Sequence, residues 1–344
     1  MQSADCEVLT AAADWLDAGH GVYLVTVVHT WGSSPRPPGS LLAVRAEDGA
    51  YVGSVSGGCV EDDLGARLAA HGARLDLPML DSYGVTREQT HKFGLPCGGR
   101  LDLVIERLAG SAPLRAILAA LRERRTVTRR LCLATGEASL HGSSGDTEFA
   151  FDGENLTRLF GPTWRLLLVG AGQLSRFVAQ MGQALDYEIV VCDPREDYAA
   201  AWVIEGVAID PRMPDDVVRE RVRDARSAVL ALTHDPRLDD LALLAALDSP
   251  AFYVGALGSR ANAARRHARL REMGVAEPAL ARLHAPIGLP LGGRTPAEIA
   301  VAILAGLTAR RHDVVLRAVG ATTSEPLSPP IGANESCGRS RASC

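Results

Sequence analysis

The chain has 344 residues, of which 47% are hydrophobic and 22% charged, and its formal net charge is -5 at neutral pH. This length and composition predict two domains with sizeable cores and exclude a globally disordered chain. Because the charge balance is acidic and no basic patch stands out, the sequence disfavours nucleic acid as a partner.

The N-terminus has no basic start followed by an apolar stretch, which argues against a signal peptide. No apolar run reaches the roughly 18 residues that a membrane-spanning helix needs. The seven cysteines are odd in number and scattered, so a disulfide framework is not expected. These features predict a cytoplasmic protein without a membrane partner.

The first 160 residues predict a mixed α+β domain. Apolar stripes at helical spacing alternate with short β-rich runs, and Asp48-Gly49 is a hairpin turn signal. In chain order we expect a helix at 5–17, a strand at 21–30, a loop at 31–40, two strands around Asp48-Gly49, a helix at 59–71, a strand at 100–108, a helix at 112–124 and further strands up to Phe160.

Gly161-Pro162 marks the expected boundary with a second domain at residues 161–315. Strands and helices alternate regularly beyond it, a pattern typical of a Rossmann-like, doubly wound parallel sheet. Strands are expected at the start of 165–196 and at 207–209, 227–232 and 251–255, with closing helices at 259–273 and 296–311. The last stretch, residues 316–344, is rich in Ser, Pro and Gly and predicts a disordered tail.

A glycine turn follows the first apolar strand of the second domain. The segment "GAGQLS" opens a helix, and its Gly170 permits a tight turn while Gly172 lets the backbone approach a pyrophosphate. Ser175 is small enough for the helix–strand contact that a third glycine usually makes. Asp193, about 20 residues on, ends the next strand, where a ribose-binding acid is expected. The pattern predicts a nucleotide site, although an Asp before Pro194 also suits a plain turn.

A later strand-to-helix junction carries more candidate contacts. Gly258, Ser259 and Arg260 follow the strand expected at 251–255. Because the carboxyl ends of strands line the ligand crevice of an open α/β sheet, we include these residues in the predicted site. Thr295 and Glu298, by contrast, form a capping-box pattern that is mainly structural.

Two cysteines of the first domain stand beside paired glycines, Cys59 in "VGSVSGGCVE" and Cys97 in "GLPCGGR". A structural zinc site is disfavoured because neither cysteine has a second ligand at short spacing. Thiol chemistry stays open, because a helix start lowers a thiol pKa whereas the acidic residues at 61–63 raise it. A role for each cysteine in packing alone also stays open.

The glycine pairs themselves suit an anion. Backbone N–H groups and hydroxyls at a helix start can bind a phosphate or oxyanion, and a proline-rich loop at 31–40 supplies an arginine. The alternative is that these prolines only shape the loop. The candidate anion contacts of the first domain are Arg36, Ser56, Gly57, Gly58, Gly98 and Gly99.

Six motifs, in this order, resemble the XdhC/CoxI family: "GSSPRPPGSLL", "GSVSGGCVEDDL", "FGLPCGGRLDLVIE", "LLLVGAGQLSRFVAQ", "YVGALGSRANAARR" and "IGLPLGGRTPAEIAVAI". The resemblance covers roughly residues 8–312. The third glycine of the nucleotide turn is replaced by Ser175, and the C-terminal tail has no counterpart.

The resemblance implies a non-catalytic maturation factor for a molybdenum hydroxylase of the xanthine dehydrogenase or carbon monoxide dehydrogenase type. Such proteins bind the molybdenum cofactor, as molybdopterin or its dinucleotide, protect it and hand it to the apo-enzyme. The resemblance also implies a role in sulfuration with a cysteine desulfurase, and contact with a molybdopterin nucleotidyltransferase.

Carried over to this chain, the family's two cysteine motifs match Cys59 and Cys97, which would contact the molybdenum or its dithiolene sulfurs. Gly170, Gly172 and Asp193 would hold the phosphate or nucleotide end of the cofactor. We therefore expect the cysteine turns and the nucleotide turn to face one cleft between the domains. A homodimer is expected only because two-fold assemblies are common.

Two other functions remain open on the sequence. One is an NAD(P)-dependent oxidoreductase that uses the same glycine turn, although no hydride-acceptor residue is identifiable. The other is a carrier on which Cys59 or Cys97 accepts a persulfide. The sequence names neither the client enzyme nor the form of the cofactor.

Overall fold

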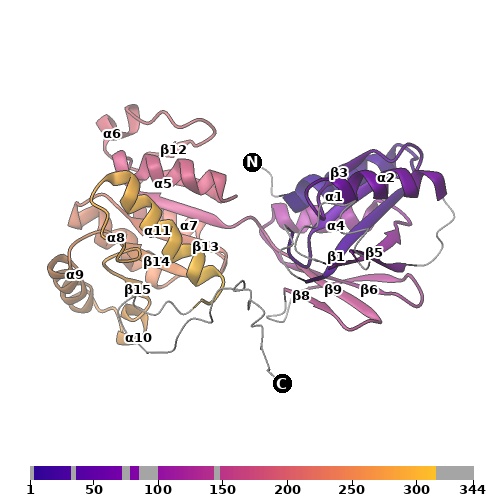
Figure 1. Cartoon of the computed structure of the whole chain (residues 1–344). Coiled ribbons are helices and arrows are strands. Elements are labelled where there is room, and N and C mark those ends of the chain that lie inside the picture. The colour runs from indigo at the N-terminus through magenta and orange to yellow at the C-terminus, as the bar shows by residue number, and fades with distance from the viewer. Residues whose placement is uncertain (1–3, 32–35, 72–77, 85–99, 143–147, 315–344) are drawn as a thin grey trace, which may run out of the picture.

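The computed structural model describes residues 4–31, 36–71, 78–84, 100–142 and 148–314. Figure 1 shows two lobes, an N-terminal lobe with antiparallel sheets and a C-terminal lobe built on a parallel sheet. The predicted fold class, a mixed α+β region followed by a Rossmann-like one, is confirmed. The tail predicted at 316–344 lies outside the described residues.

The first sheet of the N-terminal lobe has the strand order β3-β2-β1-β5-β4. Its long central strand alternates its side chains between two cores, as a strand buried on both faces must. Helices α1 (Ala4–Asp17) and α4 (Ala112–Arg122) cover one face, and α2 (Cys59–His71) covers the other. The strands are β1 (Val22–Trp31), β2 (Leu41–Arg45), β3 (Tyr51–Gly53), β4 (Met79–Tyr83) and β5 (Arg100–Arg107). The sequence pattern did not predict β4.

A second antiparallel sheet, with the order β7-β6-β9-β8, packs against the first through a small apolar cluster that includes Val28 and Leu131. Arg129 and Glu106 join the two sheets in a buried bidentate ion pair at 2.7 and 2.6 Å. The strands are β6 (Val127–Cys132), β7 (Ala138–Gly142), β8 (Phe149–Phe151) and β9 (Asn155–Phe160).

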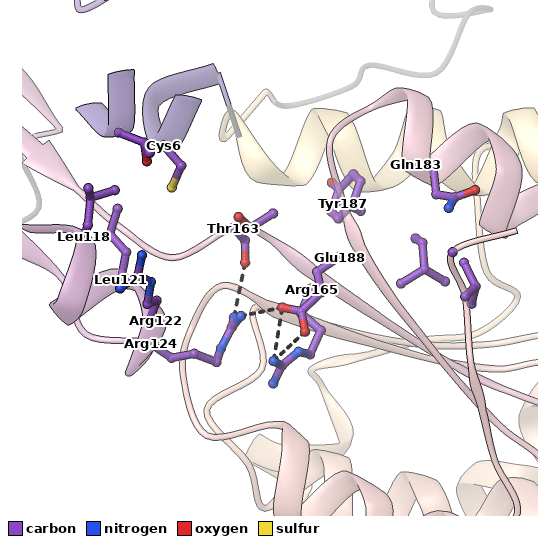
Figure 2. Close-up of a pocket in the computed structure, with 14 residues that line it drawn as sticks. Cys6, Leu118, Leu121, Arg122, Arg124, Thr163, Arg165, Gln183, Tyr187 and Glu188 are labelled. Carbon is purple, nitrogen blue, oxygen red and sulfur yellow. Dashed lines mark hydrogen bonds and ion pairs between the residues drawn. The ribbon is translucent and has the colours of Figure 1, made fainter. Parts of the chain in front are cut away.

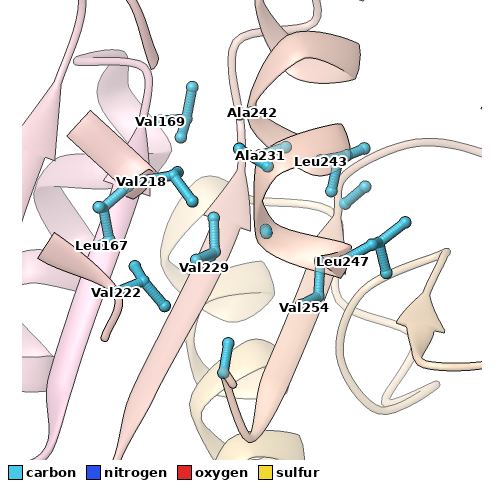
Figure 3. Close-up of a cluster of buried hydrophobic side chains, with 14 of the residues drawn as sticks. Leu167, Val169, Val218, Val222, Val229, Ala231, Ala242, Leu243, Leu247 and Val254 are labelled. Atoms are coloured by element: carbon cyan, nitrogen blue, oxygen red, sulfur yellow. The ribbon is translucent and has the colours of Figure 1, made fainter. Parts of the chain in front are cut away.

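The C-terminal lobe contains a parallel sheet with the order β12-β11-β10-β13-β14-β15. Helices α5 and α11 cover one face, and α7 and α8 cover the other, so successive strand residues point into different cores. Figure 3 shows the core on the face covered by α7 and α8, where Leu167, Val229 and Val254 of adjacent strands pack with Leu243 of α8. The strands are β10 (Arg165–Val169), β11 (Glu188–Cys192), β12 (Ile209–Asp210), β13 (Ser227–Ala231), β14 (Tyr253–Ala256) and β15 (Leu283–His284).

The helices of this lobe begin where the sequence provides caps. Asp235, Ser259 and Thr295 each accept a backbone N–H at the start of a helix, and Thr295 forms the predicted capping box with Glu298. The helices are α5 (Gln173–Ala184), α6 (Glu196–Ala200), α7 (Pro214–Arg221), α8 (Pro236–Leu247), α9 (Arg260–Glu272), α10 (Glu277–Leu280) and α11 (Pro296–Arg311). Within the described ranges, none of the helices has the length and apolar character to cross a membrane.

The lobes meet at the amino ends of the parallel strands. Arg124, just after α4, donates to Asp224 at 2.6 Å and to Glu188 at 2.8 Å, and both carboxylates lie at or before the start of a strand. Since β10, β11 and β13 all run away from this junction, their carboxyl ends lie at the far edge of the C-terminal lobe (Figure 1). The prediction that the turn of Cys59 and the nucleotide turn face one cleft is therefore wrong within a single chain, and the turn of Cys97 lies outside the described residues.

Candidate functional site

The turn between β10 and α5 has the backbone form that its glycines predict. Gly170 has φ +106°, and a Cβ there would lie 2.9 Å from the side chain of Thr233. At Gly172, the residue before α5, a Cβ would have nothing within 4 Å, so the backbone is open to a ligand. Ser175 is buried at the position of the third glycine. The turn is thus built for close approach of a phosphate group, and nucleotide binding by Gly170 and Gly172 stays a prediction.

Asp193 ends β11 beside this turn, and the protein already uses both of its oxygens. Its carboxylate is fully buried, accepts the N–H of Ala171 at 2.8 Å, and forms a fork with Arg195 at 2.8 and 2.7 Å. Burial raises the pKa of Asp193, but the hydrogen bonds from Arg195 and Ala171 outweigh it, and the net pKa lies below its usual value. A ribose hydroxyl would have to displace Arg195, so ribose binding by Asp193 also stays a prediction.

The junction between β14 and α9 lies at the same edge of the sheet. Ser259 caps α9 by accepting the N–H of Asn262 at 3.2 Å, and Arg260 is the first, exposed residue of the helix. Gly258 has φ +151°, which a side chain disfavours. The fold therefore brings Gly170, Asp193 and this junction to one edge, whereas no contact shows a ligand role for Gly258, Ser259 or Arg260.

A buried ion pair that the sequence pattern did not reveal ties two loops of this edge together. Asp239 of α8 is fully buried, accepts the N–H and hydroxyl of Thr233, and pairs with Arg266 of α9 at 2.9 Å. Arg266 also donates to the carbonyl of Leu257 at 3.0 Å. Asp239 and Arg266 lie 27 residues apart in helices that look like ordinary charged helices, so only the packing of α9 on α8 brings them together.

The turn before α2, which carries Cys59, is filled by a side chain of the same chain. Glu61, only 2% exposed, accepts the four successive backbone N–H groups of residues 55–58 at 2.7–2.9 Å. It also accepts the hydroxyls of Ser54 and Ser56. Burial raises the pKa of Glu61, yet these hydrogen bonds outweigh it and lower the pKa to about 2. The expectation that Ser56, Gly57 and Gly58 form an open anion site is therefore wrong for this conformation, because Glu61 occupies their donors.

The remaining predicted contacts of the N-terminal lobe are only partly described. Arg36 donates from Nε to the hydroxyl of Ser54 at 3.1 Å, so the proline-rich loop does reach the cysteine turn. Cys59 is the first residue of α2, but its side chain is not described, and Cys97, Gly98 and Gly99 lie outside the described residues. The part of the chain that the structure covers contains no cluster of three or more His, Cys, Asp or Glu side chains able to hold a metal ion. Metal contact by Cys59 and Cys97 stays a prediction.

A pocket of about 380 Å³ lies between the lobes beside α4 and is lined by residues of both, and we call it the α4 pocket. Figure 2 shows Arg124 and Arg165 reaching toward Glu188 beneath Cys6 of α1. Arg165 pairs with Glu188 at 2.8 Å, and Arg124 also donates to the carbonyl of Thr163 at 3.3 Å. The ion pairs of Arg124 with Asp224 and Glu188 therefore connect the two lobes beside this pocket.

Comparisons with known proteins agree with the motif order. A family model described as the XdhC Rossmann domain matches residues 166–307, and a model described as the XdhC and CoxI family matches residues 15–74. The chain belongs to the XdhC and CoxI family. The cysteine turn at 54–59 lies inside the second match, and the nucleotide turn lies inside the first.

Two curated relatives match most of the chain in sequence, and a solved structure shares its fold. The chain is 28% identical over 321 residues to the molybdenum cofactor insertion chaperone PaoD of Escherichia coli K12, covering 88% of each protein. It is 25% identical over 331 residues to a probable xanthine dehydrogenase subunit from Bacillus subtilis 168, covering 85% of this chain and 94% of that protein. A crystal structure from Bacillus halodurans, titled a xanthine dehydrogenase, shares the fold with a TM-score of 0.69 at 23% identity, over 93% of this chain and 98% of that one.

Proposed function

We propose that this chain is a maturation chaperone that binds the molybdenum cofactor and delivers it to a molybdenum hydroxylase. The observation that carries the proposal is the match to PaoD, named a molybdenum cofactor insertion chaperone, over 88% of both chains. The name of the Bacillus subtilis relative, which refers to xanthine dehydrogenase, supports a hydroxylase as the client.

The cysteine turn fits this role because it is rigid where the cargo would bind. Glu61 fixes four consecutive backbone groups of the turn, so the start of α2 is held in one conformation before any ligand arrives. We propose that Cys59, with Cys97, contacts the sulfur-rich end of the cofactor. Assistance in sulfuration with a cysteine desulfurase belongs to the same proposal.

The nucleotide turn lies at the edge of the parallel sheet that faces away from the N-terminal lobe. If the cofactor arrives as the dinucleotide from a nucleotidyltransferase, we propose that the Gly170–Gly172 turn of a second copy binds the nucleotide end. This gives the expected homodimer a geometric reason. Mixing a Cys59→Ala chain with a Gly172→Ala chain would then restore one complete site, whereas each variant alone would have none.

The test of the proposed function is the pterin and molybdenum content of the full chain purified from a host that makes the cofactor. We expect pterin in the wild type, loss of most of it in Cys59→Ala and Cys97→Ala, and retention in Cys132→Ala, which removes a partly exposed thiol from β6. Wild-type protein without pterin would overturn the proposal. Equal retention in all three variants would overturn the role of the two cysteines.

The turn between β10 and α5 also suits an alternative function, that of an NAD(P)-dependent oxidoreductase, because Gly172 leaves the backbone open to a pyrophosphate. Titration with NADH and NADPH separates the two functions. The oxidoreductase would bind a nicotinamide nucleotide and keep its affinity without Cys59 and Cys97, whereas the chaperone would purify with pterin.

A further inference from the structure

A second pocket between the lobes, of about 330 Å³, lies beside Trp164, and we call it the Trp164 pocket. The N-terminal lobe contributes Asp5, the loop at 37–40 and strands β8 and β9. The C-terminal lobe contributes Trp164, Arg226 and the end of α11 with Arg311 and His312. Neither the family motifs nor the proposed cysteine contacts assign it a role.

Its basic groups lie inside, and its acidic groups lie at the rim. The side chain of Arg158 is 13% exposed and pairs with Asp5, which is 39% exposed. The side chain of Arg226 is 19% exposed and pairs with Glu148, which is 71% exposed. Arg158 and Arg226 are therefore less exposed than the carboxylates that pair with them, and water weakens the compensation that Asp5 and Glu148 provide.

Charge compensation in the Trp164 pocket is also incomplete. Nη1 of Arg158 is buried without a hydrogen-bond partner. Arg311 makes no ion pair with a carboxylate among the described residues and instead packs over the ring of Trp164 at 4.9 Å. Arg226 packs over the same ring at 5.2 Å, and burial lowers its pKa despite the attraction of Glu148. Trp164 therefore holds the guanidiniums of Arg226 and Arg311 in place at the pocket, whereas the unpartnered Nη1 of Arg158 is enclosed by protein.

We infer that the Trp164 pocket binds a phosphate group. Arginine presents its N–H donors in a planar fork that matches phosphate oxygens, and three such forks converge here from both lobes. Arg124 of the α4 pocket also pairs with Asp224, whose side chain is only 18% exposed, whereas Arg311 has no carboxylate partner among the described residues. An anion in the Trp164 pocket would supply the charge that Asp5 and Glu148 provide only at its rim.

The loop that lines the pocket is also linked to the cysteine turn. Pro37 to Ser40 line it, and Arg36, the residue before them, donates to Ser54 of that turn at 3.1 Å. A ligand with sulfur at one end and phosphate at the other could therefore contact both within one chain. The phosphate of the molybdenum cofactor is the ligand we assign, and this identity rests on the proposed function; the phosphate site itself does not.

The direct test is calorimetric titration of the full chain with inorganic phosphate at low ionic strength. Arg311→Gln removes one fork from the pocket, and Arg310→Gln is the matched control, since Arg310 is the preceding residue of α11, does not line the pocket and pairs with exposed Asp313. We expect Arg311→Gln to weaken phosphate binding about tenfold or more, the value of a lost charged hydrogen bond, and Arg310→Gln to change it less than about twofold. Arg158→Lys keeps the charge but loses the fork, and it should weaken binding even if Arg311→Gln unfolds the chain.

Pterin content of the same variants separates the two proposals. Loss of both phosphate affinity and pterin in Arg311→Gln supports the site and its ligand. Loss of phosphate affinity with full pterin retention overturns the cofactor as the ligand, whereas absence of pterin from the wild type overturns the proposed function and leaves the phosphate site standing. Wild-type protein that binds no phosphate, or equal affinities in Arg311→Gln and Arg310→Gln, overturns the site.

Discussion

The two glycine turns of this chain look alike in sequence but differ in what occupies them. In the β10–α5 turn the backbone at Gly172 is open, and Asp193 accepts only the N–H of Ala171 from the turn while it pairs with Arg195. In the turn before α2 the acid at Glu61 folds back and accepts the four backbone N–H groups of residues 55–58. A glycine turn before a helix therefore predicts an anion but does not say whether the anion is a ligand or a side chain of the protein.

The largest expected loss of stability comes from removing the Glu61 carboxylate from the turn before α2. Glu61→Ala leaves four backbone N–H groups, one buried and three partly buried, without their acceptor, and we expect the free energy of unfolding to fall by about 4 kcal/mol. Urea denaturation measures it. Glu123→Ala, which removes an exposed carboxylate paired with Arg125, should change the same quantity by less than about 0.5 kcal/mol. A loss of less than about 1 kcal/mol in Glu61→Ala would show that an ion or water replaces the carboxylate.

The next largest effect is the pH dependence of the stabilisation that Glu61 provides. The pKa of Glu61 lies at about 2 in the folded protein and has an ordinary value of 4.5. Because the folded pKa is depressed, the stabilisation is present above pH 4.5 and is lost as the pH falls toward 2, by about 3 kcal/mol in total. Urea midpoints of the wild type and Glu61→Gln, measured across this range, should converge as the pH falls. Parallel curves would contradict the assignment.

Alanine substitutions at the two glycines of the β10–α5 turn should differ in how much they lower the free energy of unfolding. Gly170→Ala forces a side chain into φ +106° and against Thr233, and we expect a loss of about 2 kcal/mol in the free energy of unfolding. Gly172→Ala has φ -76° and open space, so the loss should stay within about 0.5 kcal/mol. If the turn accepts a pyrophosphate, Gly172→Ala should still weaken binding of ADP in a calorimetric titration. Equal destabilisation by both substitutions would mean that the turn is not open.

Much of the fold could be predicted from local signals. Alternating apolar runs located the strands at 165–169 and 227–231, and Thr295 with Glu298 located the start of α11, because strand burial and helix capping depend on neighbours in the sequence. The strand β4 was missed because its residues, Met79–Tyr83, are partly exposed on an edge strand and lack a clear alternation.

The candidate site could be predicted only in part. The turn at 170–172 was found because Gly170 has a backbone conformation that other residues rarely adopt and Gly172 leaves the backbone open. The role of Glu61 was missed although it is close in sequence to its partners, because an acidic residue in a first helical turn also suits the helix dipole. The basic interior of the Trp164 pocket joins Arg158, Arg226 and Arg311 across the lobes, and no local pattern connects them.

The amino-acid sequence by itself determined the family, the alternation of elements and the places where the backbone must turn, because these depend on side-chain chemistry within a few residues. Only the tertiary structure decided which edge of the parallel sheet meets the N-terminal lobe, which donors are already satisfied and which guanidiniums lack a counter-charge. Those properties arise from contacts between segments up to 153 residues apart, such as Asp5 and Arg158, and from the burial that the contacts create.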